Sequence, residues 1–325
     1  FKDVGARFMA RCLEYFNRGN TNKVTVLVAT SGDTGAAVAN GFLGVKDVNV
    51  VILYPSKKVS DIQEKQITSL GQNISALEVQ GTFDDCQAMV KNAFLDKDIT
   101  KKTQLTSANS INVARWLPQM FYFFFAYKKL YKTHKDIVFS VPSGNFGNVC
   151  AGMMAQQLGL PVKHFIAANN DNNVVTRYLK TQLYAPVKSV QTISNAMDVG
   201  DPSNFIRIQE IYKNKFDSLQ KNLSSYSFNN NQTRKAMFDI YTKHGYVADP
   251  HGAVGYLGCK AYLEKNTTAH CVFLETAHPT KFLNVVEDVV KIKQDLPKQI
   301  QAVIANKKVA TTISNYSDLK AFLLL

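Results

Sequence analysis

The sequence predicts an α/β protein made of two three-layer α/β units with mostly parallel sheets, and two observations support this fold class. Short runs rich in β-branched residues alternate with segments of helical periodicity, which is the pattern of a parallel sheet with helices on its faces. The alternation occurs on both sides of a long helical segment, and a length of 325 residues favours two domains. We therefore expect a leading helix in residues 1–19, a smaller α/β domain in residues 20–132 and a larger α/β domain in residues 133–325.

The smaller domain is expected to be one compact unit, preceded by a helix at Arg7–Phe16. Its apolar, β-branched runs predict strands at Val24–Ala29, Val48–Tyr54 and Ile74–Val79. Helical periodicity predicts helices at Ala36–Gly44, Asp61–Leu70 and Asp84–Asp96.

The larger domain follows a long helix predicted at about Asn112–Tyr131. Its expected strands are Ile137–Val141, Lys163–Ala168 and Ala269–Leu274, and its expected helices are Asn148–Leu158, Thr233–His244 and Ala253–Glu264. The polar stretch Ser224–Asn231 predicts a mobile surface loop. Ligands of open α/β sheets bind beyond the carboxyl ends of the strands, so the loops after these strands are the candidate sites.

The composition is that of a soluble globular protein, with 46% hydrophobic and 19% charged residues. Its 38 basic and 25 acidic residues give a formal net charge of +13. The lysines are spread among acidic residues without the dense basic block of a nucleic-acid-binding arm, so we expect no nucleic-acid partner. The charge is compatible with a phosphate-bearing small molecule.

The most apolar stretch, Trp116–Tyr127, is broken by Pro118 and is too short to cross a bilayer, so we expect a buried helix there and no membrane partner. The five cysteines are widely separated and form no CxxC pair. This spacing favours buried, reduced thiols over disulfides or a zinc site, and with it a cytoplasmic location. Because the chain begins at Phe1 with apolar segments following at once, we expect that a leading segment of a longer protein precedes it.

The first candidate loop, Thr30–Gly35, follows a predicted strand and opens a helix. Its small residues let the backbone approach a ligand, and hydroxyls with successive amides at a helix N-terminus suit a carboxylate or a phosphate. An ordinary turn with a helix cap explains the same residues equally well. The loop does not match the GxGxxG dinucleotide fingerprint, because its glycines are three apart and a third is absent.

The second candidate loop, Ser143–Asn148, also lies between a predicted strand and a helix. Its two glycines expose backbone amides that can form a cup for a phosphate dianion at the positive end of the helix. The occurrence of two such loops in one chain favours anion binding at both. A third candidate, Glu275–Pro279, follows the last apolar strand, and its Thr276 hydroxyl either donates one oriented hydrogen bond into a pocket or caps a helix.

Beyond these loops, the sequence resembles the threonine synthases of the pyridoxal-phosphate (PLP) fold type II group, which has the tryptophan synthase beta-like architecture. The resemblance extends in order over essentially the whole chain. It is found at Phe1–Met9, Thr30–Gly35, Asn109–Asn112, Gly144–Asn148, Ala196–Asp198, Ser203–Phe205, Asp249–Gly252 and Thr276–Pro279. Two departures accompany it: the family's N-terminal portion is absent, and the stretch between Arg207 and Tyr246 is shorter and more polar than the family pattern.

The resemblance implies roles for individual residues. Lys2 should carry the cofactor covalently and act as the proton shuttle, although the residue taken alone is a solvated terminal lysine. The residues that match the cofactor phosphate cup are Gly144, Asn145, Phe146, Gly147 and Asn148. Thr276 should face the pyridine nitrogen, and a neutral partner there leaves more of the carbanion stabilisation to proton transfers by the lysine.

The substrate is expected to bind at two further matches to the family. The loop that resembles the family's substrate loop contains Thr30, Ser31, Gly32, Asp33 and Thr34, where related cysteine synthases carry Asn at the position of Asp33. Ser110, Asn112 and Arg115 are candidates for holding the substrate phosphate, Arg115 through a bidentate contact. The alternative for Arg115 is a surface ion pair.

The implied reaction converts O-phospho-L-homoserine and water to L-threonine and phosphate by γ-elimination and β-addition of water, in a monomer or homodimer. The freed amine of Lys2 would move protons at successive substrate carbons while the cofactor serves as electron sink. Two alternatives stay open: a related PLP-dependent phospho-lyase that releases 2-ketobutyrate, and a catalytically silent binding or regulatory homologue.

Overall fold

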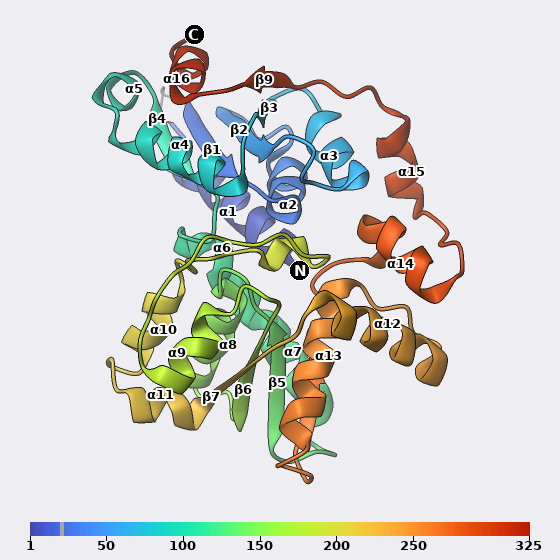
Figure 1. The fold of residues 1–325 in the computed structure, drawn as a ribbon. Helices are drawn as coiled ribbons and strands as arrows, with labels where there is room; N and C mark the ends of the chain where they lie inside the picture. Colours follow the sequence, from blue (N-terminus) through green and yellow to red (C-terminus); the bar gives the residue numbers. More distant parts are fainter. Residues whose placement is uncertain (20–22) are drawn as a thin grey trace. The chain divides into compact units, whose positions relative to one another are not determined.

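A computed structural model describes residues 1–19 and 23–325 of the chain (Figure 1). The chain folds as two compact units. The central unit consists of Phe1 and Trp116–Asp295, and the flanking unit consists of Lys2–Arg115 and Leu296–Leu325. These units differ from the division expected at residues 19/20 and 132/133, because the leading helix packs within the flanking unit and the end of the chain returns to it.

The flanking unit is built on a five-stranded parallel sheet with strand order β4-β1-β2-β3-β9. The strands are β1 (Val24–Ala29), β2 (Val48–Pro55), β3 (Ile74–Val79), β4 (Gln104–Ser107) and β9 (Thr311–Ile313). The three strands expected from the sequence are confirmed. The two edge strands were missed because they are short and carry few apolar residues, which is the usual composition at a sheet edge.

Both faces of the flanking sheet are covered by helices, so its strands carry apolar side chains on both faces. Successive residues of one strand point to opposite faces and enter different core clusters. Val26 and Val28 of β1 contribute to one core cluster, while Leu27 and Ala29 contribute to another. Residues of α1 and α2 fill the first cluster, and residues of α4 and α16 fill the second. The helices are α1 (Lys2–Phe16), α2 (Asp33–Phe42), α3 (Asp61–Thr68), α4 (Phe83–Leu95), α5 (Lys97–Lys102), α15 (Lys298–Ala305) and α16 (Tyr316–Leu324).

The central unit is built on a four-stranded parallel sheet with strand order β7-β6-β5-β8. The strands are β5 (Ile137–Pro142), β6 (His164–Asn169), β7 (Leu223–Ser227) and β8 (His270–Phe273). The expectation of a mobile loop at Ser224–Asn231 was wrong, since its first residues form β7 and its last begin helix α12. The polar strand is stabilised by hydrogen bonds to β6, among them Ser225 Oγ to Ala167 O at 2.9 Å.

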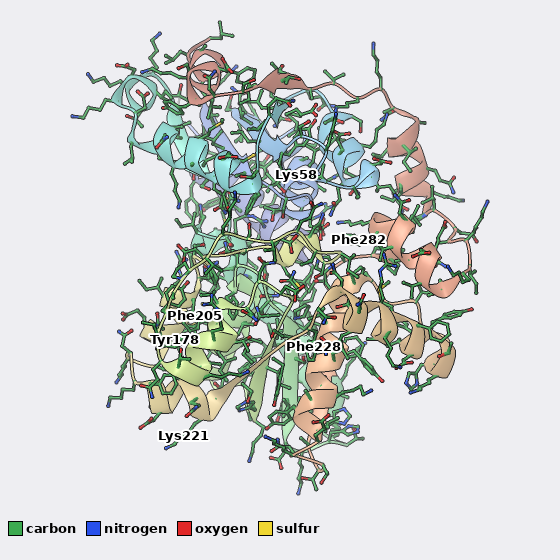
Figure 2. The ribbon with its side chains drawn as sticks, viewed as in Figure 1. Lys58, Tyr178, Phe205, Lys221, Phe228 and Phe282 are labelled. Carbon is green, nitrogen blue, oxygen red and sulfur yellow. The ribbon has the colours of Figure 1, made fainter. Side chains whose placement is uncertain are left out.

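The helices of the central unit are mostly packed on this sheet. They are η1 (Leu117–Gln119), α7 (Met120–Leu130), α8 (Gly147–Gln157), α9 (Val174–Thr181), η2 (Asn195–Met197), α10 (Phe205–Ile211), α11 (Phe216–Asn222), α12 (Asn230–His244), α13 (Pro250–Leu263), η3 (Pro279–Phe282) and α14 (Leu283–Val290). Their aromatic contacts include an edge-to-face pair between Tyr178 and Phe205, with ring centroids 5.3 Å apart (Figure 2).

The single helix expected at Asn112–Tyr131 is divided into α6 (Val113–Trp116), η1 and α7. Pro118 explains the break, because proline has no amide hydrogen for the helical ladder and clashes with the preceding turn. The division between the two units falls in α6, between Arg115 and Trp116. Among the described residues, no helix is both long enough and apolar enough to cross a membrane.

Candidate active site

The Thr30–Gly35 loop lies at the carboxyl end of β1 and is closed by its own side chains. The buried Thr30 hydroxyl accepts hydrogen bonds from the amides of Gly32 at 2.9 Å and Gly35 at 2.7 Å. Gly32 has φ of 132°, and a Cβ there would lie 2.5 Å from the side chain of Gln63. Gln63 Nε2 in turn donates to Asp33 Oδ1 at 3.1 Å. The side chains of Thr30 and Asp33 therefore form hydrogen bonds that stabilise the loop conformation. Ser31 and Thr34 are half-buried and are the remaining side chains of the loop that could contact a ligand.

A second loop of the flanking unit is attached to the same strand end. The Asn109 side chain donates to Ala29 O at 2.6 Å and accepts from Ala29 N at 3.1 Å, so it continues the pairing of β1 with β4 beyond Ser107. Asn112 donates to Ser107 O at 3.1 Å and accepts from Ala114 N at 3.0 Å. These bonds bring Ser110 and Asn112 to the end of the sheet from which Thr30 follows β1.

Arg115 connects this loop to Lys2. Its guanidinium donates to Ala108 O at 2.6 Å and to Lys2 O at 3.1 Å, and the residue is 2% exposed. The surface-ion-pair alternative for Arg115 was therefore wrong. Burial lowers the pKa of Arg115 to about 10, and the charge of Asp3 opposes that shift, so the guanidinium stays protonated at neutral pH. A positively charged group thus holds the main chain of Lys2.

The Ser143–Asn148 loop lies at the carboxyl end of β5 and opens α8. Phe146 has φ of 62° and ψ of 8°, a left-handed conformation that turns the loop into the helix, and its ring is buried against Phe205. Within the described part of the chain, the amides of Gly144, Phe146 and Gly147 have no protein acceptor. Free amides at the N-terminus of an α-helix suit a phosphate dianion, so these residues fit the phosphate of PLP.

Neighbouring segments fix this loop from outside. A Cβ on Gly144 would lie 2.7 Å from Met197 Cα and 2.8 Å from Ala196 O, so only glycine fits against η2. Asn145 Oδ1 accepts from Ser203 N at 2.6 Å, and Asn204 Nδ2 donates to Asn145 O at 2.9 Å. The loop is thus held in place without using the amides that a phosphate would need.

Thr276 lies just beyond β8, which pairs in parallel with β5. Leu274 N donates to Ser140 O at 3.0 Å and continues that pairing towards Thr276. The Thr276 loop and the Ser143–Asn148 loop therefore follow neighbouring strands at the same edge of the central sheet. Thr276 itself is half-buried at this edge.

A buried polar cluster lies beside Thr276, and sequence reasoning assigned it no role. The Asp249 carboxylate caps α13 and binds His251 Nδ1 at 2.6 Å, with both side chains at most 2% exposed. The Glu275 carboxyl occupies the space that a Cβ on Gly252 would need. Burial, and next the negative charge of Asp249, raise the pKa of Glu275 to about 9, so the Glu275 carboxyl is neutral at pH 7. The sequence Asp249-Pro250 before a helical segment predicts that Asp249 caps the helix. The contact between Gly252 and Glu275 joins residues distant in the sequence, so no local sequence pattern could have predicted it.

The predicted site residues fall into two groups, one in each unit. Lys2, Ser110, Asn112, Arg115 and the Thr30–Thr34 loop belong to the flanking unit. The Gly144–Asn148 loop and Thr276 belong to the central unit. Each group gathers at the carboxyl edge of its own parallel sheet, where α/β enzymes bind their ligands.

Comparison with known proteins identifies two matching families. The model of the pyridoxal-phosphate dependent enzymes matches residues 1–275, and the model of the C-terminal region of threonine synthase matches residues 252–323. The threonine synthase of Buchnera aphidicola subsp. Baizongia pistaciae is 46% identical over 326 positions, which cover 100% of this chain and 75% of the relative. That of Escherichia coli is 45% identical over 301 positions, covering 92% and 69%.

Solved structures agree with these matches. The crystal structure of threonine synthase from Escherichia coli has a TM-score of 0.94 and 41% identity, covering 100% of this chain and 75% of that chain. The PLP-bound threonine synthase from Brucella melitensis has a TM-score of 0.89 and 32% identity, with the same coverage. A tomato threonine deaminase, at 17% identity and a TM-score of 0.64, shares the fold alone.

The two parallel α/β sheets and the match over residues 1–275 define a pyridoxal-phosphate dependent enzyme of fold type II. Within that class, the chain is more than 40% identical to bacterial threonine synthases along nearly its whole length. The chain belongs to the threonine synthase family. The family resemblance, the fold class and the cofactor that the resemblance implies are confirmed.

Proposed function

We propose that this chain converts O-phospho-L-homoserine and water to L-threonine and phosphate. Family membership along the whole chain carries the proposal. The phosphate cup at the N-terminus of α8 supports it, because its glycine-lined amides have the charge and geometry that a cofactor phosphate needs.

Lys2 is the proposed catalytic residue. Bound PLP supplies an electron sink for negative charge that develops at the substrate Cα. The amine of Lys2 takes the proton from Cα and then one from Cβ, and a proton is returned to Cγ after phosphate has left. The hydroxyl of water then adds at Cβ, and the last proton is returned to Cα, which completes L-threonine. One amine must reach several carbons in turn, and the bond from Arg115 to the carbonyl of Lys2 holds its main chain during these steps.

The central unit is proposed to hold the cofactor at two points. Gly144, Asn145, Phe146, Gly147 and Asn148 surround the phosphate, with backbone amides donating to it. Thr276 donates a hydrogen bond at the pyridine nitrogen. A neutral hydroxyl keeps that nitrogen less strongly protonated than an aspartate would, so the proton transfers by Lys2 must contribute more.

The flanking unit is proposed to hold the substrate. The Thr30–Thr34 loop binds the substrate carboxylate through its amides and through the hydroxyls of Ser31 and Thr34. Ser110, Asn112 and Arg115 bind the substrate phosphate. The structure supports a second role for Arg115, since two of its donors bind main-chain carbonyls and so position both Lys2 and the loop at Ala108.

The proposal is tested by comparing threonine formation from O-phospho-L-homoserine between the wild-type chain, Lys2→Ala and Lys91→Ala. Lys91 is an exposed lysine on α4 and serves as the matched control. We expect Lys2→Ala to lose at least about a thousandfold in rate, the scale of losing a group that serves as both covalent carrier and base, and Lys91→Ala to keep it.

The products of the same assay distinguish the remaining alternatives. Formation of 2-ketobutyrate without threonine would identify a phospho-lyase. A wild-type chain that binds no PLP, with no cofactor attached at Lys2 after borohydride reduction, would identify a silent homologue. Either result overturns the proposal.

A further inference from the structure

His251 is a buried imidazole for which the proposed reaction has no use. It is 1% exposed and lies in the first turn of α13, next to the capping residue Asp249. Its ring packs against Phe282, with ring centroids 4.9 Å apart; Figure 2 labels Phe282. A buried polar ring in an apolar setting requires partners for both nitrogens, and the identity of those partners fixes its state.

The two partners of His251 define one tautomer. Nδ1 lies 2.6 Å from Asp249 Oδ1, and Nε2 accepts the amide hydrogen of Ala196 at 3.2 Å. A nitrogen that accepts an amide hydrogen carries no proton, so the proton is on Nδ1 and is donated to Asp249. Asp249 also accepts from the amides of His251 and Gly252. Burial alone would raise the pKa of Asp249, but His251 and these donors lower it, so the carboxylate stays charged.

The residue whose amide binds His251 also approaches the phosphate loop, through its own carbonyl oxygen. Ala196 lies in η2, and its carbonyl oxygen would be 2.8 Å from a Cβ placed on Gly144. The following Met197 would be 2.7 Å from the same atom and is 2% exposed. The backbone of η2 therefore has two neighbours that bear on the phosphate loop: the imidazole of His251, at the Ala196 amide, and Gly144, at the Ala196 carbonyl and Met197.

The end of η2 is fixed by further hydrogen bonds to Asp198, the residue that follows it. Asp198 accepts from Thr192 Oγ1 at 2.7 Å, from Asn170 Nδ2 at 2.8 Å and from Asn172 Nδ2 at 3.1 Å. This network restrains the end of η2, but it contains no bond to the Ala196 amide. The acceptor for that amide is His251.

We propose that His251, held by Asp249 as the Nδ1–H tautomer, is a positioning residue for the cofactor phosphate loop and acts through the backbone of Ala196. The unprotonated Nε2 fixes Ala196 by accepting its amide hydrogen, and Ala196 then sets the close approach of η2 to Gly144. This inference rests on the proposed role of Gly144–Asn148 as the phosphate cup. An imidazole protonated at Nε2 would point a hydrogen at the amide hydrogen of Ala196, so this bond would be lost and Ala196 would no longer be fixed.

Three variants separate the hydrogen bond from simple packing. His251→Leu keeps a side chain of similar volume but removes the acceptor for the Ala196 amide. His251→Gln places an oxygen near the position of Nε2 and so keeps an acceptor there. His164→Leu is the matched control, because His164 is another buried, hydrogen-bonded histidine, at the amino end of β6. Each variant is titrated with PLP to obtain Kd, and the ³¹P resonance of the bound cofactor is recorded.

We expect His251→Leu to weaken PLP binding by about tenfold, the scale of one lost buried hydrogen bond, and to shift the ³¹P resonance. His251→Gln should stay within about twofold of the wild type by the same reasoning, and so should His164→Leu. Equal Kd values for His251→Leu and His251→Gln would overturn the proposal. A wild-type chain that binds no PLP would instead overturn the proposed function, so the two failures are distinguishable.

A second measurement needs neither a variant nor the cofactor. In the ¹⁵N spectrum of the apo wild-type chain labelled at histidine, His251 should show a protonated Nδ1 and an unprotonated Nε2. An imidazolium, or the opposite tautomer, would overturn the proposal even if His251→Leu failed to fold.

Discussion

Glu275 is a half-buried residue whose carboxyl pKa, raised to about 9 by desolvation and then by the charge of Asp249, makes stability depend on pH. Between the usual value of 4.5 and about 9, the folded chain keeps a proton that the unfolded chain releases. Its contribution to stability is therefore fully present below pH 4.5 and is lost as pH rises towards 9. Glu275→Gln, which cannot ionise, should not share this loss.

This prediction is tested by urea unfolding of the wild type and Glu275→Gln at pH 5, 7 and 9. The free energy of unfolding of the wild type should fall relative to that of the variant at each step. Glu264→Gln changes an exposed carboxyl of the same unit and should follow the wild type. Parallel curves for the wild type and Glu275→Gln would contradict a neutral Glu275.

Gly144 gives a second residue-scale prediction. A methyl group there would meet the backbone of Ala196 and Met197, which cannot rotate away as a side chain can. We expect Gly144→Ala to cost about 1–3 kcal/mol, the usual range for overpacking, and to weaken PLP binding. Gly255→Ala is the control, since its methyl would be 3.4 Å from the nearest atoms. If both variants bound PLP equally well, the close packing of the loop would have no functional role.

The sequence predicted single site residues only where a motif or a family match pointed to them. Gly144 was predicted, because a glycine between a strand and a helix is a local signal. The role of His251 was not, because its partner Ala196 lies 55 positions away. Arg115 was predicted as a substrate ligand, yet its burial and its bond to Lys2 O depend on packing that a local pattern does not contain.

At the scale of elements, the apolar strands and amphipathic helices were predictable and the polar ones were not. β1 and β3 have the expected bounds, because runs such as Val24–Ala29 are buried throughout. β7 was missed because its serines bond to β6 and it needs no apolar run. Pro118 is a sequence signal for a break in the helix expected at Asn112–Tyr131. The sequence did not predict that the chain there forms three separate elements, α6, η1 and α7.

The segment that leads into β9 gives an element-scale prediction. Lys308 Nζ lies 2.7 Å from Glu64 and 2.9 Å from Glu78, and Val309 N donates to Thr68 O at 3.0 Å. Burial alone would lower the pKa of Lys308, but its hydrogen bonds to both glutamates raise it. The lysine thus ties the returning C-terminal segment to α3 and β3.

We expect Lys308→Ala to lower the free energy of unfolding by about 1 kcal/mol, the upper range for a partly exposed ion pair. The loss should shrink in about 1 M salt, where the Debye length is about 3 Å. Lys307→Ala removes the neighbouring exposed lysine and controls for net charge. A salt-independent loss would mean that Lys308 acts through packing.

At the scale of the whole molecule, the fold class followed from the alternating pattern, while the unit boundaries did not. The flanking unit is made of two segments that are far apart in the sequence, Lys2–Arg115 and Leu296–Leu325. Its last strand, β9, pairs with β3, more than 200 positions earlier in the sequence. A linear pattern assigns consecutive residues to one domain, so it could not predict this return.

The cofactor should stabilise the whole chain, because a ligand that binds only the folded state shifts the unfolding equilibrium by mass action. At a PLP concentration 100 times its Kd the gain is about 2.7 kcal/mol, and we expect a higher thermal midpoint by differential scanning fluorimetry. Lys2→Ala should keep a smaller shift, since the phosphate loop still binds PLP without the covalent bond. Pyridoxal, which has no phosphate, should stabilise the wild type less than PLP does. Equal shifts with pyridoxal and PLP would mean that the loop at Gly144–Asn148 does not hold the phosphate.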